Sequence, residues 1–402
     1  MTPYADFTYF GLLLYIVVPT IVLGLFGRAN ARWALLATVL AVVVQCSDDI
    51  PVGTSWHVRE IWILLICAAW QSAVAFAFLR WKSRAIFYTA VASAIAPLVA
   101  AKWLLHPTPD ISLGFGISYV TFRALDVVFS IHDGVLKTLS PGQYIAFVFF
   151  APTISSGPID RYRRFAQDWL RKRSRSEFLT DLDTAVEHIF RGFLYKFILA
   201  ALISTHWVEE VVLQSGVLPV ISYMYGYTLY LFFDFAGYSA FAIGLSYLLG
   251  VRTPENFNLP FLSRNIRDFW QRWHISLSFW FRDHVHMRFL LAAAKGKWFR
   301  GKHTANQLGL LLTFGLMGVW HGTELHYLLY GLYHAALLIG YDWFTRWNKQ
   351  RKLWGETAPW RFANRVLTIH AVCFGLLLFS GRLTPNRAPA PAPGVEAAVP
   401  AV

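Results

Sequence analysis

The sequence has few charged residues for its length, and this shortage excludes most soluble folds. Of its 402 residues only 15% are charged, whereas 56% are apolar and the mean hydropathy is +0.43. Soluble domains carry about a quarter charged residues. A chain with so little charge cannot cover its surface with polar side chains, so the composition predicts an integral membrane protein.

Several chemical signatures are also missing. The chain contains no G-x-S-x-G nucleophile elbow, no G-x-x-x-x-G-K-[ST] phosphate loop and no H-E-x-x-H zinc motif. A serine hydrolase, an ATP-driven pump and a zincin are therefore not expected. Cysteine is scarce: Cys46, Cys67 and Cys373 lie in or beside apolar segments at no metal-like spacing, so we predict neither a disulfide framework nor a redox pair.

Long apolar segments are what the chain does have. A membrane-spanning helix needs about 20 mostly apolar residues, and segments of this kind predict about ten crossings. We treat residues 1–386 as a single transmembrane domain and expect the Ala/Pro-rich tail, residues 387–402, to be disordered. The predicted spans are Thr8–Phe26, Trp33–Val44, Ile61–Leu79, Ala85–Ala101, Tyr144–Ile154, Ala185–Ser204, Leu218–Phe233 extended to Leu249, Leu308–Trp320, Tyr327–Trp343 and Val366–Ser380.

The positive charge indicates orientation rather than nucleic-acid binding. The net charge of +13 comes from Lys/Arg clusters between the apolar segments, among them Arg161–Arg175 and Lys295–Lys302. Placing these clusters in the cytoplasm puts the N-terminus outside. Two charged segments, Leu113–Val135 and Phe269–Leu291, then cannot be ordinary crossings and are predicted to be re-entrant. Polar segments are tolerated at membrane depth only inside protein or along a water-filled cavity, so we expect the functional site there.

His321 is the first candidate for chemistry. It ends an apolar span that begins near Leu308, and the predicted orientation places it toward the external half of the bilayer. A near-neutral imidazole can take a proton from a hydroxyl group and return it to a leaving group. The alternative interpretation is a structural histidine, buried against one helix partner or lying at the interface beside Trp320.

His274 is the second candidate. Helical spacing places it on one face with Arg267, Trp270, Gln271 and Ser278, a polar and aromatic face suited to lining a tunnel. The alternative is a structural network around an unpaired arginine.

Other ionisable residues in apolar surroundings point to structural roles. Asp234 is a lone carboxylate inside an apolar span, where it is expected to pair with an arginine of the re-entrant segment or to shape the cavity. His284 and His286 are two residues apart, so they point to different sides of a helix, and no metal site is predicted there.

Four stretches resemble the membrane-bound O-acyltransferase family. The longest, Asn256–Asp283, reads NFNLPFLSRNIRDFWQRWHISLSFWFRD. The others are Ser155–Phe165 (SSGPIDRYRRF), Phe232–Ser239 (FFDFAGYS) and Val319–Gly322 (VWHG). Within this family, the SFWFRD and GPIDR sequences are most similar to those of the branch that transfers D-alanyl groups to teichoic acids. The C-terminal tail has no counterpart in that pattern, and His284 and His286 replace aromatic or aliphatic residues.

This resemblance implies an all-α polytopic fold, a ring of about ten or eleven transmembrane helices around a thin centre, with re-entrant helices and a tunnel. It implies that His321 is the catalytic base and His274 the second catalytic histidine. The residues expected to line the tunnel or position the substrate are Arg267, Trp270, Gln271, Ser278, Trp320 and Asp234.

The resemblance also implies the donor, the acceptor and the location. No metal or bound cofactor is expected; the acyl group would arrive as a thioester on the phosphopantetheine of a small acidic carrier protein. The acceptor would be a hydroxyl of an envelope glycopolymer, and the enzyme would lie in the inner (plasma) membrane. The residues expected to dock the carrier on the cytoplasmic side are Val285, Met287, Arg288, Lys295, Lys297 and Arg300.

Two other functions stay open at this point. The same scaffold could transfer acetyl groups to an exported polysaccharide. A transporter could instead use His274 and His321 to relay protons, but transporters commonly carry two internal repeats, and none is visible in this sequence.

Overall fold

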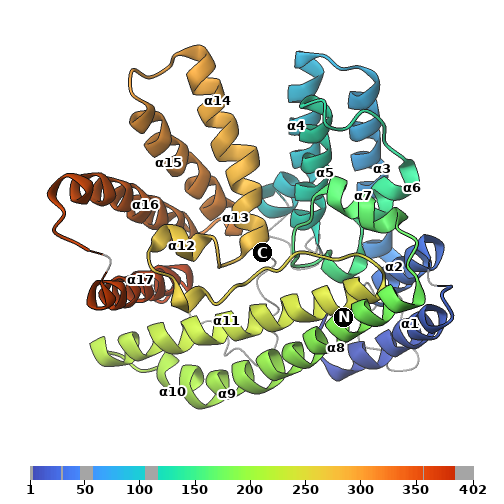
Figure 1. Cartoon of the computed structure of the whole chain (residues 1–402), viewed down its shortest axis with the longest axis horizontal. Helices are drawn as coiled ribbons and strands as arrows, with labels where there is room; N and C mark the ends of the chain where they lie inside the picture. The colour runs from blue at the N-terminus through green and yellow to red at the C-terminus, as the bar shows by residue number, and fades with distance from the viewer. Residues whose placement is uncertain (1–2, 29, 46–57, 105–115, 356, 385–402) are drawn as a thin grey trace. The chain divides into compact units, whose positions relative to one another are not determined.

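A computed structural model describes residues 3–28, 30–45, 58–104, 116–355 and 357–384. Helices, turns and loops account for these residues, and no β-strand occurs among them (Figure 1). The described residues divide into two compact units, one built from those between 3 and 193 together with 237–254, and the other from 194–236 together with those between 255 and 384. The predicted tail lies outside the described residues.

The first unit contains the N-terminal helices and the end of α11. Its elements are α1 (Phe7–Leu25), α2 (Ala31–Gln45), α3 (Val58–Arg80), α4 (Arg84–Val99), η1 (Ala100–Leu104), α5 (Ile117–His132), α6 (Pro141–Val148), η2 (Ala151–Thr153), α7 (Tyr162–Leu170) and α8 (Arg175–Phe193). An aromatic cluster fills its centre, where Tyr4, Phe10 and Phe193 surround Phe241 of α11 with ring centroids 4.7–5.6 Å from its own.

The second unit contains the remaining helices. Its elements are η3 (Leu194–Ala200), α9 (Ala201–Ile203), η4 (Ser204–Val208), α10 (Glu209–Val212), most of α11 (Val217–Leu248), η5 (Pro260–Leu262), α12 (Ile266–Trp270), α13 (Ile275–Phe281), η6 (Arg282–His286), α14 (Met287–Gly296), α15 (Lys302–His321), α16 (Leu325–Arg351) and α17 (Ala358–Phe379).

Five of the described helices are long and apolar enough to cross a membrane. They are Phe7–Leu25, Trp62–Arg80, Arg84–Trp103, Val217–Leu248 and Ala358–Phe379, and each overlaps a predicted span. The predicted total of about ten crossings, the single domain over residues 1–386 and the re-entrant tunnel stay predictions.

One predicted span is wrong. Tyr144–Ile154 is not a continuous helix, because α6 has only eight residues and ends at Val148, before the 3₁₀ turn η2. Eight residues extend about 12 Å, well short of the roughly 30 Å hydrocarbon thickness of a bilayer. Pro152, inside the predicted span, cannot donate a backbone hydrogen bond and is compatible with this break.

The charged residues of the first predicted re-entrant segment tie loops to helix α5. Arg123 is 1% exposed and donates hydrogen bonds to the carbonyl oxygens of Phe147 and Val148 at 3.1 Å and of Thr153 at 2.7 Å. Asp126, one turn later, accepts hydrogen bonds from the Arg161 guanidinium group at 2.9 Å. Arg123 thus satisfies carbonyl groups at the C-terminal end of the short helix α6, and Asp126 holds the start of α7, so both charges have a structural role.

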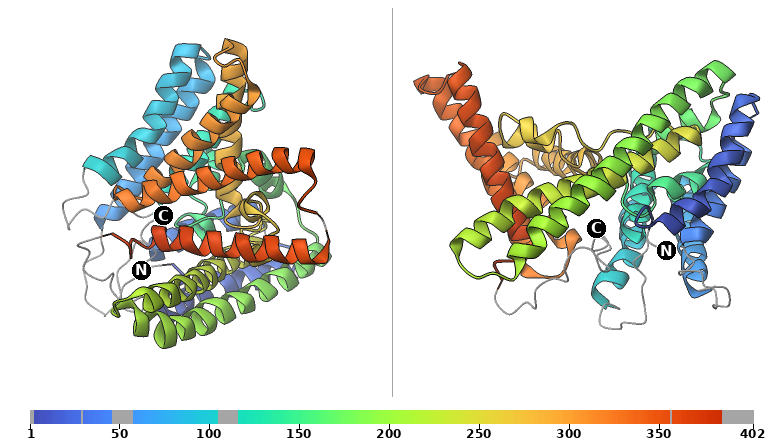
Figure 2. Two further views of the ribbon diagram at one scale, coloured as in Figure 1. Left: turned by 90° about the vertical axis from the view of Figure 1, so that its left-hand side faces the viewer. Right: turned by 90° about the horizontal axis from the view of Figure 1, so that it is seen from below.

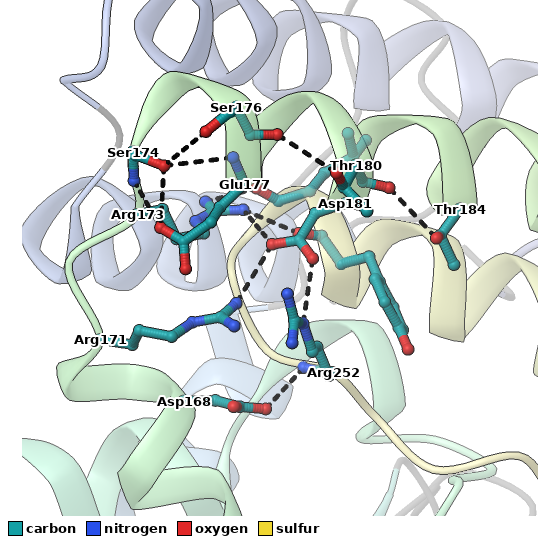
Figure 3. A network of polar contacts seen from close by, with 12 residues as sticks. Asp168, Arg171, Arg173, Ser174, Ser176, Glu177, Thr180, Asp181, Thr184 and Arg252 are labelled. Carbon is teal, nitrogen blue, oxygen red and sulfur yellow. Dashed lines mark hydrogen bonds and ion pairs between the residues drawn. The ribbon is translucent and has the colours of Figure 1, made fainter.

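A second polar network holds the link between α7 and α8 (Figure 3). Asp181 is 1% exposed and its carboxylate meets Arg171 at 3.1 Å, Arg173 at 3.5 Å and Arg252 at 3.0 Å. Arg173 also donates to the carbonyl oxygens of Tyr247 and Leu248, which satisfies the C-terminal end of α11. Burial lowers the pKa of the Arg173 side chain, and the Asp181 carboxylate opposes that shift. Asp181 therefore connects α8 with the α7–α8 link and with the segment that follows α11.

In the second unit, α14 and α15 form a helical hairpin, and α15, α16 and α17 pack against one another in turn (Figures 1 and 2). A Cβ atom on Gly318 of α15 would meet the backbone of Tyr327, and one on Gly331 of α16 would meet the backbone of Phe314. Only glycine allows these two helices to approach so closely. The crossing sets the position of the C-terminal end of α15, where His321 lies.

Candidate functional site

A cavity of about 320 Å³ opens inside the second unit. Its walls come from α12, α13, η6, α15 and α16. Four of the residues predicted to line a tunnel do line this cavity: Arg267, Trp270, Gln271 and Ser278. The volume falls in the range of small-molecule sites, about 300–1,000 Å³.

The cavity wall combines exposed charged side chains with buried apolar ones. The side chains of Arg267 and Arg282 are 56% and 53% exposed, respectively. Phe281 and Met317, which also line the cavity, are only 4% and 2% exposed. A molecule bound in the cavity would therefore contact both charged and apolar side chains.

The register of α15 connects the cavity with His321. The lining residues Leu310, Phe314 and Met317 follow one another at helical spacing, and His321 comes four residues after Met317 on the same face. Trp320 is 5% exposed, and its ring centroid lies 6.4 Å from that of Phe281. His321 itself is not among the lining residues, but it continues the face of α15 that lines the cavity.

Aromatic rings surround His321. Its ring centroid lies 4.6 Å from Trp320, 5.0 Å from Phe379, 6.1 Å from Tyr330 and 6.3 Å from Tyr327, and the side chain is half-buried. These contacts limit the rotation of the imidazole ring. A half-buried imidazole of fixed orientation is suited to proton transfer, provided that a substrate reaches it.

The second histidine lies at a break between two helices. Helix α12 ends at Trp270 and α13 begins at Ile275, with His274 at the N-cap in the left-handed conformation (φ 42°, ψ 53°). The continuous helical face predicted for residues 267–278 is therefore wrong. Of its five members, His274 is the one that does not line the cavity.

Asn256 stabilises the break between α12 and α13 through hydrogen bonds. Its side-chain oxygen lies 3.0 Å from Nδ1 of His274 and accepts a hydrogen bond from the Ser276 hydroxyl group at 2.8 Å, while its carbonyl oxygen accepts one from the Ile275 amide at 2.9 Å. Asn256 is fully buried. A non-glycine residue stays in the left-handed region only where its surroundings fix it, and Asn256 is a main source of that constraint.

Removing the Asn256 side chain should release His274. We expect Asn256→Ala to lower acyl transfer by roughly tenfold, because a buried ring that loses its hydrogen-bond partner costs about 1–3 kcal/mol. The matched control is Asn258→Ala: Asn258 is exposed and bonds Arg272 only through backbone atoms, so this variant should keep full activity. Initial rates of the two purified variants provide the comparison. Equal rates would show that the Asn256 contact does not matter for transfer.

Asp234 pairs with a different partner from the one expected. Its carboxylate forms a salt bridge with Lys196 of η3 rather than with an arginine of residues 269–291. The next residue, Phe235, packs edge-on against His274 with ring centroids 4.8 Å apart. Asp234 is not among the residues that line the cavity, so its contribution is to hold α11 where Phe235 meets the histidine.

The residues predicted to dock a carrier lie along one stretch of chain. Val285 belongs to η6, and Met287, Arg288 and Lys295 belong to α14; Lys297 and Arg300 follow in the loop before α15. Met287 and Leu291, one turn apart, are 44% and 56% exposed. The stretch therefore presents apolar side chains followed by exposed cations.

Sequence reasoning missed several residues of the cavity wall. They include Asn306, Thr313 and Asp342, together with Arg282 and His286. Arg282 and His286 were visible as polar residues of the second re-entrant segment, and α15 spacing relative to His321 pointed to Thr313. Asp342 belongs to α16, which lies far from α12 along the chain, so no local sequence pattern could have identified it as a cavity residue.

A comparison with known families agrees with this arrangement. The model of the membrane-bound O-acyltransferase (MBOAT) family matches residues 66–380, a range that contains the cavity and both histidines. The chain belongs to the membrane-bound O-acyltransferase family. Family membership together with the apolar helices makes this MBOAT protein a membrane-embedded acyltransferase.

Individual relatives share most of its length. This MBOAT protein is 41% identical to a teichoic acid D-alanyltransferase of Bacillus subtilis (strain 168) over 398 residues, which cover 95% of this chain and 98% of the relative. It is 37% identical to one of Lacticaseibacillus rhamnosus, with the same coverage of both chains. It is also 32% identical to a probable alginate O-acetylase of Pseudomonas syringae pv. tomato, over 56% of this chain and 42% of the relative.

Proposed function

We propose that this enzyme is a multi-pass D-alanyltransferase of the inner (plasma) membrane. It moves a D-alanyl group from a carrier-protein thioester to a hydroxyl of a cell-envelope polymer such as teichoic acid. The observation that carries the proposal is the cavity, which is lined in part by the face of α15 that continues to His321. Likeness to teichoic acid D-alanyltransferases over nearly the whole chain supports the choice of acyl group.

The chemistry assigns a separate role to each part of the site. The acceptor hydroxyl approaches His321, and the imidazole ring takes the hydroxyl proton as the oxygen attacks the thioester carbonyl. The new C–O ester bond forms, the C–S bond breaks, and the thiolate of the carrier arm takes up the proton. His274, fixed by Asn256, positions the thioester or stabilises the negative charge on its carbonyl oxygen.

The carrier is proposed to dock on the stretch from Val285 to Arg300. Exposed Met287 and Leu291 offer an apolar contact, and Lys295, Lys297 and Arg300 attract an acidic partner.

Electrostatic attraction between the carrier and this stretch weakens with salt, because the Debye length falls to roughly 3 Å at 1 M ionic strength. We therefore expect the apparent KM for the carrier to rise with ionic strength while kcat changes little.

A transfer assay with purified protein tests the proposed function. The enzyme in lipid nanodiscs is given an acceptor polyol and carrier protein loaded with either D-alanyl or acetyl thioester, and mass spectrometry identifies the group on the product. We expect D-alanyl ester. Acetyl ester on the product would instead indicate the alternative function, a polysaccharide O-acetyltransferase. The similarity to a probable alginate O-acetylase, which covers 56% of this chain, is the reason for testing that alternative. Absence of any ester, together with solute uptake into liposomes, would revive the transporter hypothesis.

A further inference from the structure

The link between α16 and α17 carries a cluster of cations with few acidic partners (Figure 1). We call residues 343–355 and 357–365 the α16–α17 tip. Arg346 pairs with Asp342 at 3.0 Å, and the one acidic residue in the sequence from 343 to 379 is Glu356, which lies outside the described residues. Four exposed cations of the tip form no ion pair within the described part of the chain: Lys349, Arg351, Lys352 and Arg361.

Trp354 brings the cations of the two helices together. Its backbone N–H donates a hydrogen bond to Oδ1 of Asn348 at 2.8 Å, and its indole N–H donates one to Oδ1 of Asn364 at 2.8 Å. The Trp354 ring also packs against Trp360, with ring centroids 4.1 Å apart. The residues that directly follow these three contact residues in the chain are all cations: Lys349, Arg361 and Arg365.

Large apolar side chains are exposed beside these cations. Trp347, Leu353 and Phe362 are 47%, 64% and 70% exposed, respectively. Leu353 directly follows Lys352, and Phe362 directly follows Arg361. An exposed apolar side chain beside a cation is suited to a membrane interface, because the apolar part enters the boundary of the acyl chains while the charge stays among the headgroups.

Helix stability explains only part of this charge. Lys349 and Arg351 lie in the last turn of α16, where a cation interacts favourably with the helix dipole. Arg361 lies near the start of α17, where the dipole disfavours a cation, and the first turn of α17 contains no acidic residue. A negatively charged partner outside the chain would offset this unfavourable interaction.

We propose that the α16–α17 tip binds the anionic phospholipid headgroups of the bilayer leaflet that it meets. Helix α17 is long and apolar enough to cross a membrane, so its polar first turns lie where such a span leaves the bilayer. Each Lys or Arg near an anionic leaflet adds to the attraction, and several such residues surround Trp354. This binding requires only membrane-embedded helices and is independent of the acyl group that the enzyme transfers.

Cross-linking from the tip tests the proposal in the intact enzyme. Benzoylphenylalanine is incorporated in place of Leu353, and the full-length protein is placed in nanodiscs with equal amounts of phosphatidylglycerol and phosphatidylcholine. After illumination, mass spectrometry of the tip peptide gives the ratio of the two lipid adducts. We expect phosphatidylglycerol adducts to exceed phosphatidylcholine adducts at least about threefold, because several cations attract one headgroup layer.

Charge variants show whether the tip cations cause this preference. The test variant neutralises three of them: Lys349→Gln, Lys352→Gln and Arg361→Gln. A matched control neutralises three exposed cations outside the tip: Arg28→Gln, Arg32→Gln and Lys82→Gln. Both variants change the net charge equally, but only the test variant should bring the adduct ratio close to one. In the unaltered tip the preference should also fall at 1 M salt, where the Debye length is about 3 Å.

Four outcomes would overturn the lipid site. They are equal adducts of the two lipids in the unaltered tip, no lipid adduct at all, a preference that persists in the test variant, and a preference lost equally in the control. A carrier-protein adduct that replaces the lipid adduct when loaded carrier is added would also overturn it, because the tip would then be a protein-docking surface. The acyl-transfer assay is decided separately from each of these results.

Discussion

Replacing His321 with alanine is expected to lower the rate of acyl transfer by about 10²–10⁴-fold, the usual contribution of a general base. The reason is geometric, because the lining face of α15 runs through Met317 directly to His321. The hydroxyl group of an acceptor is a poor nucleophile until its proton is removed. Single-turnover rates with loaded carrier protein measure this step separately from carrier docking.

The same helix supplies the control for this experiment. His303 lies in the first turn of α15 and is exposed, so His303→Ala removes an imidazole without touching the site. Both variants should elute as the unaltered protein does on size exclusion, since His321 is only half-buried. If His321→Ala keeps more than about a tenth of the normal rate, another group acts as the base.

The sequence predicted the apolar helices well, because hydropathy over a long window depends on local composition alone. Spans predicted at Thr8–Phe26, Ala85–Ala101 and Val366–Ser380 match α1, α4 with η1, and α17 within a few residues at most ends. The exception at α17 is informative. Its polar first turns, from Ala358 to Arg365, extend the helix beyond its apolar part, and hydropathy cannot report such an extension.

The break at His274 could not be predicted from spacing. No glycine or proline lies between Trp270 and Ile275, so the segment continues a helical pattern. The helix ends there because the Ile275 amide donates its hydrogen bond to Asn256, 18 residues before His274 in the sequence. In a continuing helix that amide would bond within the helix instead. Such a contact forms only in the folded chain, so the sequence around His274 does not predict it.

The ion-pair partners of the charged residues could not be predicted from the sequence either. The sequence indicated that Asp234 needs a cation, but not that Lys196, on a segment with π-helical hydrogen bonding, would supply it. The cavity residues Arg267, Trp270, Gln271 and Ser278 were found through their shared helical spacing, although the helix that justified it is interrupted. They line one cavity because α12 and α13 both border it, and not because they share one face of a continuous helix.

Exchanging the buried Asp181 of α8 for asparagine is expected to cause a large loss of stability. The carboxylate balances Arg171, Arg173 and Arg252, and removing one member of a buried ion cluster usually costs about 3–5 kcal/mol. The side chains of Arg252 and Arg171 are 42% and 23% exposed, so water compensates part of the loss and we expect about 2–4 kcal/mol. The thermal unfolding midpoint in detergent should fall by several degrees.

Asp183 provides a matched control for this variant. It lies two residues further along α8, is exposed and takes part in no ion pair among the described residues, so Asp183→Asn should leave the midpoint within about a degree. The loss in Asp181→Asn should persist at high salt, because buried pairs are screened far less than exposed ones. Equal midpoints for the two variants would mean that the three arginines find enough water or other acceptors without Asp181. In that case the backbone bonds of Arg173 to Tyr247 and Leu248 would be what holds the end of α11.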